Sequence, residues 1–338
     1  MNFQDVMKEA KADIGPYCKV CPVCNGIACK GQIPGPGGKA TGSVFIRNYA
    51  KIQDIKVNLD TLYGKTKTDT TLELFGKTFD LPVFTAPVGA VQMHYSDKYN
   101  DLTYSQAVLE GARQSGTVAF TGDGAVDAVY EGTIEAIKAL GGWGIPTIKP
   151  WEMPTIDKKV KMAEDAGAMA IAMDIDAAGL AFLAKQDKPV GPLSMEQLKQ
   201  ITSSNKLPFI LKGVMTVKGA LKALEAGVSA IVVSNHGGRV LDQTPATIEV
   251  LPEIVEAVQG RMKVLIDGGF RSGLDVFKAL ALGADGVMIC RPFVTAVFGG
   301  GQEGVIAYYD QLKTELVDAM VMTGANTLDE IDHSKLFV

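Results

Sequence analysis

Eight short apolar runs recur between residues 81 and 290, and this rhythm constrains the fold more than any other feature of the sequence. The runs are rich in β-branched residues, and stretches long enough for a helix lie between them. They read LPVFTAP, TVAFT, IPTIK, MAIAMD, PFILK, SAIVVS, KVLID and GVMIC. Continuous apolar runs of this kind are typical of strands that are buried on both faces of a parallel sheet.

A weak internal repeat points to the same architecture. AEDAGAMAIAMD, ALEAGVSAIVVS and ALALGADGVMIC align on Gly167, Gly227 and Gly283, and a fainter copy surrounds Gly116. Each copy reads as a helix end, a glycine cap and a buried strand. The spacings of 51, 60 and 56 residues leave room for one further β/α unit between copies. The pattern therefore predicts a (β/α)₈ TIM barrel over the alternative, an open doubly wound sheet.

Residues 1–80 differ from the rest, and we predict that they form a cap on a barrel of residues 81–338, within one domain overall. An amphipathic start over residues 2–12 leads into a cysteine-rich loop. The next stretch, IPGPGGKATGS, is too rich in glycine and proline for regular structure. Residues 45–80 are expected to form short β-rich segments.

Charge and hydropathy narrow the classes of partner. The net charge of −5 and the pI near 5.4 argue against nucleic acid or an anionic membrane as the main partner. No apolar run approaches the roughly 20 residues of a membrane helix, and MNFQDVMKEAKADIG lacks the apolar region of a secretory signal. We expect a cytoplasmic protein whose partner is a small molecule.

In a (β/α)₈ barrel the active site collects at the carboxyl ends of the strands. The loops after the last two predicted strands, DGGFRSG and CRP, suit a phosphate. Their glycines let backbone N–H groups approach an anion, while Arg271 and Arg291 supply positive charge. Turn-forming glycines beside solvated arginines would be the structural alternative.

The segment SNHGGRVLD, residues 234–242, is the most informative in the chain. Its glycines leave space around His236, whose imidazole can act as a general base near neutral pH. Arg239 follows three residues later and could hold a carboxylate with both arms of its guanidinium. A purely structural histidine is the alternative. His94 and His333 fit no such arrangement, and we expect neither to be functional.

The stretch from SNHGGRVLD to ICRP resembles the FMN-dependent α-hydroxy acid oxidase/dehydrogenase family, which includes glycolate and lactate oxidases. The likeness is dense over Leu207–Pro292, thinner over Leu81–Asp176 and faint before residue 80. It implies bound FMN, oxidation of a small 2-hydroxy acid to the 2-oxo acid, and a homo-oligomer of four or eight chains.

The resemblance also implies roles for single residues. His236 would be the base, Asp176 its orienting carboxylate, Arg239 the clamp for the substrate carboxylate, and Lys212 the cation beside the flavin. The residues implied to contact the cofactor are Pro87, Val88, Gly89, Lys212, Ser234, His236, Gly237, Asp267, Gly268, Gly269, Arg271, Cys290 and Arg291.

Several positions depart from the family pattern, and they gather on the substrate side. The loop Gly35–Gly38 lacks the usual tyrosine, a second arginine after Asp176 is missing, and the segment from there to Lys212 is short. Lys149 stands where a second tyrosine would be. We predict that this lysine binds the substrate carboxylate; the alternative is a lysine that only pairs with Asp174.

Four of the five cysteines lie close together in CKVCPVCNGIAC, at Cys18, Cys21, Cys24 and Cys29. Four thiolates within such a short segment can ligate an iron–sulfur cluster or a tetrahedral zinc ion. A loop of free, oxidisable thiols is the alternative.

Two other functions remain open at this stage. One is a flavin enzyme on the same scaffold with a different substrate or with non-redox isomerase chemistry. The other is a flavin- or metal-binding redox sensor without turnover. The joint presence of His236, Arg239 and Asp176 favours an enzyme, because a sensor would need only the FMN contacts.

Overall fold

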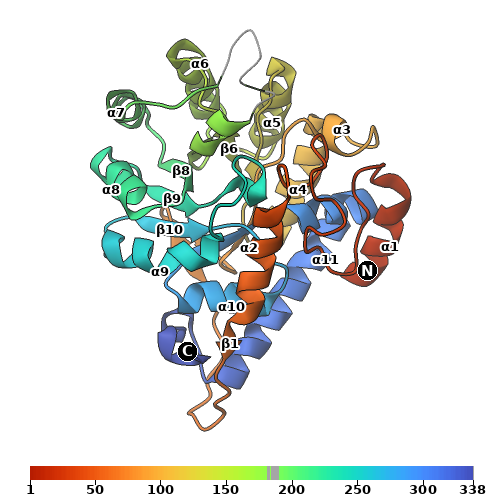
Figure 1. The fold of residues 1–338 in the computed structure, drawn as a ribbon, viewed down its shortest axis with the longest axis vertical. Coiled ribbons are helices and arrows are strands. Elements are labelled where there is room, and N and C mark those ends of the chain that lie inside the picture. The colour runs from red at the N-terminus through yellow and green to blue at the C-terminus, as the bar shows by residue number, and fades with distance from the viewer. Residues whose placement is uncertain (181–182, 184–189, 338) are drawn as a thin grey trace.

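The computed structural model describes residues 1–180, 183 and 190–337, with helices arranged around a central set of strands (Figure 1). All eight predicted strands form: β4 (Val83–Thr85), β5 (Phe120–Thr121), β6 (Ile145–Ile148), β7 (Ile171–Asp174), β8 (Phe209–Val214), β9 (Ala230–Val233), β10 (Lys263–Ile266) and β11 (Gly286–Ile289). They are hydrogen-bonded in the order β4-β11-β10-β9-β8-β7-β6-β5. A parallel bridge between Thr85 and Ala119 closes the ring. The predicted (β/α)₈ barrel is confirmed.

The interior of the barrel explains why the strand sequences are apolar throughout. Phe84, Phe120, Ile210, Leu265 and Met288 point into one buried cluster, and each has at most 1% of its surface exposed. The alternate residues pack outward against the helices in a second, larger cluster. Each buried side chain of this size contributes about 1.5–3 kcal/mol. The strand ends are thereby held in fixed positions around one rim.

Most helices lie outside the barrel. They are α1 (Phe3–Asp13), α2 (Ser43–Asp54), α3 (Val91–His94), α4 (Asp101–Gln114), α5 (Asp127–Ala139), α6 (Met153–Asp165), α7 (Met195–Ser204), α8 (Val217–Glu225), α9 (Thr247–Val258), α10 (Gly273–Ala281) and α11 (Arg291–Thr323). The aligned glycines of the internal repeat each follow a helix and have positive φ, from 70° at Gly167 to 92° at Gly283. Their role as helix caps before buried strands is confirmed.

The expectation of β-rich segments from residue 45 onward is wrong for its first part. Residues Ser43–Asp54 form α2, which buries Val44, Phe45, Asn48 and Ile52 on one face. That spacing follows the period of a helix, and it outweighs the β-forming tendency of the individual residues. Short strands do follow, at β1 (Lys56–Val57), β2 (Leu72–Leu74) and β3 (Lys77–Phe79).

The two outermost parts of the described chain pack against each other. Helix α1 lies along α11 (Figure 1), and strand β1 pairs antiparallel with β12 (Leu336–Phe337). A Cβ atom at Gly299 would lie 1.9 Å from the carbonyl oxygen of Val6, so a glycine is required where the two helices touch. No helix in the described part of the chain is long and apolar enough to cross a membrane. Part of the shortened segment before Lys212, residues 181–182 and 184–189, lies outside the described residues.

Candidate active site

A cavity of about 750 Å³ opens at the carboxyl ends of the barrel strands. This volume is typical of a site for a cofactor together with a small substrate. Most of the predicted site residues line it: Pro87, Val88, Gly89, Lys149, Lys212, His236, Gly237, Arg239, Asp267, Gly268, Gly269, Arg271, Cys290 and Arg291. Asp176 and Ser234 lie behind this wall and contact His236 from there.

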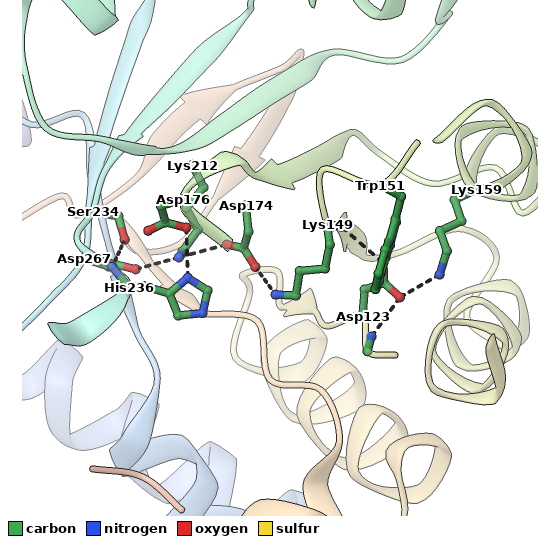
Figure 2. A network of polar contacts seen from close by, with 11 residues as sticks. Asp123, Lys149, Trp151, Lys159, Asp174, Asp176, Lys212, Ser234, His236 and Asp267 are labelled. Atoms are coloured by element: carbon green, nitrogen blue, oxygen red, sulfur yellow. Dashed lines mark hydrogen bonds and ion pairs between the residues drawn. The ribbon is translucent and has the colours of Figure 1, made fainter. Parts of the chain in front are cut away.

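The imidazole of His236 is fixed in place by its own turn and by a carboxylate. Its Nδ1 lies 2.9 Å from Oδ1 of Asp176, and its backbone N–H donates to Oγ of Ser234 at 3.1 Å (Figure 2). His236 has φ 55° and Gly237 has φ 61°. The turn therefore places both residues in the left-handed region, a backbone conformation that residues with a side chain rarely adopt. Since Nδ1 faces a carboxylate, Nε2 is the nitrogen left to exchange a proton in the cavity.

The position of Asp176 depends on a neighbouring glycine. Gly213, in the bulge at the end of β8, has φ 105°. A Cβ atom there would lie 2.6 Å from Cγ of Asp176. The LKGV segment therefore brings Lys212 to the rim and leaves space for the carboxylate that supports the histidine.

Asp174 lies between two buried lysines, as Figure 2 shows. Its carboxylate is 2.6 Å from Nζ of Lys149 and 2.9 Å from Nζ of Lys212. Lys212 also lies 3.4 Å from Asp267. Burial opposes the charged forms, but the opposite charges outweigh it, so the pKa of Asp174 is held below its usual range and that of Lys212 is raised. Lys212 therefore remains cationic beside the cavity.

Asp123, which also follows a strand, has a structural role. It accepts hydrogen bonds from Nζ of Lys159 and Nε1 of Trp151, both at 2.6 Å, and from the backbone N–H of Lys149 at 3.2 Å. With its carboxylate occupied in this way, Asp123 fixes the backbone from which the Lys149 side chain extends toward Asp174 (Figure 2).

The predicted carboxylate clamp, Arg239, contacts the cap. Its Nη1 donates to the carbonyl oxygens of Gly35 at 2.5 Å and Gly37 at 3.2 Å. These are its hydrogen bonds to the described residues, and they leave the other guanidinium donors available on the cavity wall. The cap thus orients the arginine in the loop after β9, although the two segments are about 200 residues apart in sequence.

Arg271 and Arg291 stand at one end of the cavity without a carboxylate partner among the described residues. Arg271 donates from Nε to the carbonyl of Cys24 at 2.9 Å, and Arg291 from Nε to that of Pro36 at 2.7 Å. Arg291 also stacks on the ring of Phe45, 3.7 Å from its centre. Backbone carbonyls orient both arginines but do not neutralise them, so this end of the cavity favours an anion.

Buried polar atoms provide a direct test of whether a flavin nucleotide fits. Oδ1 of Asp267 and Nη2 of Arg271 are buried without a hydrogen-bond partner among the described residues. Both residues line the cavity. The hydroxyl groups of FMN would pair with this acceptor, and its phosphate with this cationic donor. Both residues therefore fit the cofactor, because a buried polar atom without a partner costs free energy.

His94, which we expected to have no function, lines the cavity as well. Its Nδ1 accepts the backbone N–H of Gly35 at 3.1 Å, so its proton is on Nε2. Burial, together with the positive charge of Arg239, lowers the pKa of His94 to about 3 and keeps the ring neutral. The sequence signal that could have identified His94 is its position in α3, which follows the first barrel strand, β4. His333 lies on the surface.

The four clustered cysteines line a second, smaller cavity of about 210 Å³. All four are free thiols that are partly buried. Burial raises the pKa of Cys18 to about 11, and the other three thiols act on it in the same direction. Thus the sequence cluster is also a cluster in space.

Comparisons with known proteins agree with this geometry. The sequence model of a family described as FMN-dependent dehydrogenase matches residues 36–189 and 181–337. A 4-hydroxymandelate oxidase of Amycolatopsis orientalis is 31% identical over 336 residues, which cover 86% of this chain and 89% of that protein. A peroxisomal (S)-2-hydroxyacid oxidase of Arabidopsis thaliana is 52% identical over 139 residues, 41% of this chain and only 38% of the plant protein.

The same fold is present among solved structures. A mandelate oxidase variant crystallised with 2-hydroxy-phenylacetamide superposes with a TM-score of 0.81 and 29% sequence identity. The superposition covers 99% of this chain and 97% of that one. The likeness therefore includes the cap as well as the barrel.

Proposed function

Since this chain belongs to the FMN-dependent dehydrogenase family, we propose that it is an FMN-dependent oxidoreductase that converts a small 2-hydroxy acid to the 2-oxo acid. The observation that carries the proposal is the pair His236–Asp176, 2.9 Å apart, beside a cavity that contains a buried cationic lysine. The relatives named for oxidation of hydroxy acids support the substrate class.

The residues that would hold FMN follow from the shape of the cavity. Gly268 and Gly269, with Arg271 and Arg291, would bind the phosphate, and Asp267 would accept from the hydroxylated chain. The flavin ring would lie against the loop Pro87–Gly89 and the end of β8. When bound, FMN supplies an acceptor for the two electrons that leave the substrate.

His236 is the proposed general base. Its Nε2 takes a proton from the substrate, and the carboxylate of Asp176 stabilises the imidazolium that results. Lys212 keeps a positive charge at the end of β8, where it stabilises negative charge that develops beside it. Lys212 lies at the end of β8 and His236 follows the end of β9, so the positions of the cation and the base are fixed before the substrate binds.

The substrate carboxylate is the proposed partner of Arg239 and Lys149. Arg239 is held by the cap carbonyls, and Lys149 by Asp174. Neutral His94 offers an Nε2–H donor on the same cavity wall. This set of nitrogen donors takes the place of the tyrosine hydroxyls that the family resemblance led us to expect.

The purified protein should be yellow, and heating should release FMN and not FAD, because the arginine-lined end offers a terminal phosphate site. Anaerobic addition of 2-hydroxy acids, from glycolate to mandelate, should bleach the flavin with at least one of them. Colourless protein that FMN cannot reconstitute would refute the proposal.

We also propose the organisation of the chain as a cap of residues 1–80 on a barrel within one domain, assembled as a homo-oligomer of four or eight chains in the cytoplasm. Light scattering of the purified holoprotein measures the number of chains. Fractionation of the source cells tests the location.

A further inference from the structure

The proposed reaction makes no use of Cys18, Cys21, Cys24 and Cys29, yet the fold brings their thiols to one cavity. The cavity is about 210 Å³ in volume, and Arg271 and Arg291 also line it. All four thiols are free and partly buried. The first three follow a C-x2-C-x2-C spacing, with the fourth five positions later. Four thiols around one hollow can serve together as the ligands of an iron–sulfur cluster.

The separation of the thiols argues against a single tetrahedral metal ion. A tetrahedral zinc ion with Zn–S bonds of about 2.3 Å brings its sulfurs within about 3.8 Å of one another. No three cysteine sulfurs among the described residues lie within 4.8 Å of each other. The wider arrangement suits a polynuclear iron–sulfur cluster, whose core keeps the cysteine ligands further apart than one ion does.

The loop that carries the cysteines is fixed by the fold. The carbonyl of Cys24 accepts from Nε of Arg271 at 2.9 Å. A Cβ atom at Gly26 would lie 2.7 Å from the ring of Phe45, and one at Gly37 would lie 2.0 Å from the carbonyl oxygen of Cys29. Each contact requires a glycine, so the loop sits in one position against α2 and the barrel. A prearranged loop loses little entropy when it binds a cluster.

The positive charge around the smaller cavity also suits an iron–sulfur cluster. A cubane cluster with four thiolate ligands is an anion in its usual oxidation states. Arg271 and Arg291 line this cavity as well as the larger one, so the positive charge that would bind the phosphate also lies beside the thiols. Pro36 and Tyr95 line both cavities too. The two cavities therefore share these four lining residues.

We propose that Cys18, Cys21, Cys24 and Cys29 ligate one [4Fe–4S] cluster, and that the cluster conducts electrons out of the flavin cavity. The first half of this proposal stands on the cysteine site alone. The second half rests on the proposed function.

The two electrons of the reduced flavin leave it one at a time, and each transfer balances. Oxidation of one hydroxy acid to the oxo acid releases two electrons and two protons, and reduced FMN holds both electrons. The oxidised cluster accepts one electron, passes it to an external one-electron oxidant, and then accepts the second. The terminal oxidant is therefore a one-electron carrier, such as a redox protein, for which ferricyanide substitutes in the assay.

Cluster content is measured on holoprotein purified without oxygen. We expect about four irons and four inorganic sulfides per chain, with an iron–sulfur EPR signal after reduction by dithionite. Cys21→Ser/Cys24→Ser should lose this signal and most of the iron while it keeps FMN. Cys290→Ala, which removes the fifth cysteine, should keep the iron. Zinc without sulfide, or protein free of metal after reconstitution with iron and sulfide, would overturn the assignment.

The proposed transfer of electrons through the cluster is tested by comparing two rates. In Cys21→Ser/Cys24→Ser, anaerobic bleaching of the flavin by substrate should change less than threefold, while turnover with ferricyanide should fall at least tenfold. Equal turnover in both proteins would refute the electron route. If no hydroxy acid bleaches the flavin, the proposed function fails, yet iron, sulfide and the dithionite-reduced signal still decide the cluster.

Discussion

At the scale of single residues, the candidate site depends on charges that are buried and balanced. Asp174 is 1% exposed, and two lysines hold it ionised against the cost of burial. Such a group is stable only while its partners remain. Substitutions in this network therefore alter stability and chemistry together, and each test has to separate the two.

His236→Gln should retain FMN but slow the reduction of the flavin by substrate by about 10²–10⁴-fold, because proton abstraction is lost. Stopped-flow absorbance under anaerobic conditions measures this rate. His333→Gln, at an exposed position, is the matched control and should react like the wild type. Equal rates for the two variants would remove His236 from the mechanism.

Lys149→Met should raise KM for the hydroxy acid, since the loss of a charged hydrogen bond is worth about 1.5–3 kcal/mol. It should also lower Tm, because Asp174 loses a partner at 2.6 Å. Lys161→Met breaks an exposed pair with Asp165 and should change neither quantity noticeably. A lowered Tm with an unchanged KM would show that Lys149 only pairs with Asp174.

His94 makes stability depend on pH. Its pKa is about 3 in the folded protein and 6.5 when unfolded, so the unfolded chain binds the extra proton between these values. The free energy of unfolding should therefore fall as pH drops below 6.5, by roughly 2 kcal/mol from this group at pH 5. In His94→Asn that contribution should vanish, whereas His333→Asn should follow the wild type. Parallel curves for all three proteins in urea titrations would contradict this account.

At the scale of helices and strands, the sequence predicted those elements that the local pattern of apolar residues determines. The eight barrel strands were evident because each is a short apolar run followed by a helix with its own period. Helix α2 was missed because Val44, Phe45 and Ile46 favour strands locally, and packing of one face decides the outcome. The partners of Arg239 and Arg291 could not be foreseen, since cap carbonyls about 200 or more residues away supply them.

Helix α2 packs against the loop that follows β9, and this contact requires a glycine in the loop. Gly238 has φ 82°, and a Cβ atom there would lie 2.6 Å from the backbone nitrogen of Phe45. Gly238→Ala should cost at least about 1–2 kcal/mol from the backbone conformation alone, and it should weaken FMN binding through the displaced loop. Thermal unfolding and flavin titration measure the two effects.

Gly64→Ala is the control for that variant. Nothing lies within 4 Å of the added methyl group, so stability should stay within about 0.5 kcal/mol of the wild type. If Gly238→Ala changed stability as little as Gly64→Ala does, the proposed packing of α2 against the loop after β9 would be wrong.

At the scale of the whole molecule, the site is assembled from segments that are distant in sequence. Arg271 meets Cys24 across 247 residues, and Lys39 meets the loop after β9 across 201. The hydroxyl groups of Thr85 and Tyr309, 2.7 Å apart, join the first barrel strand to α11. Residues 1–80 and the barrel with its helix α11 therefore complete the two cavities together, and neither part contains a whole site.

The packing of α1 on α11 has a consequence during synthesis. The ribosome makes α1 roughly 280 residues before it begins α11. At about 5–20 residues per second, the first helix waits about 15–60 seconds for the surface on which it will rest. The cavity around the four thiols is likewise incomplete throughout that interval, because Arg271, Arg291 and Tyr308, which also line it, are made last.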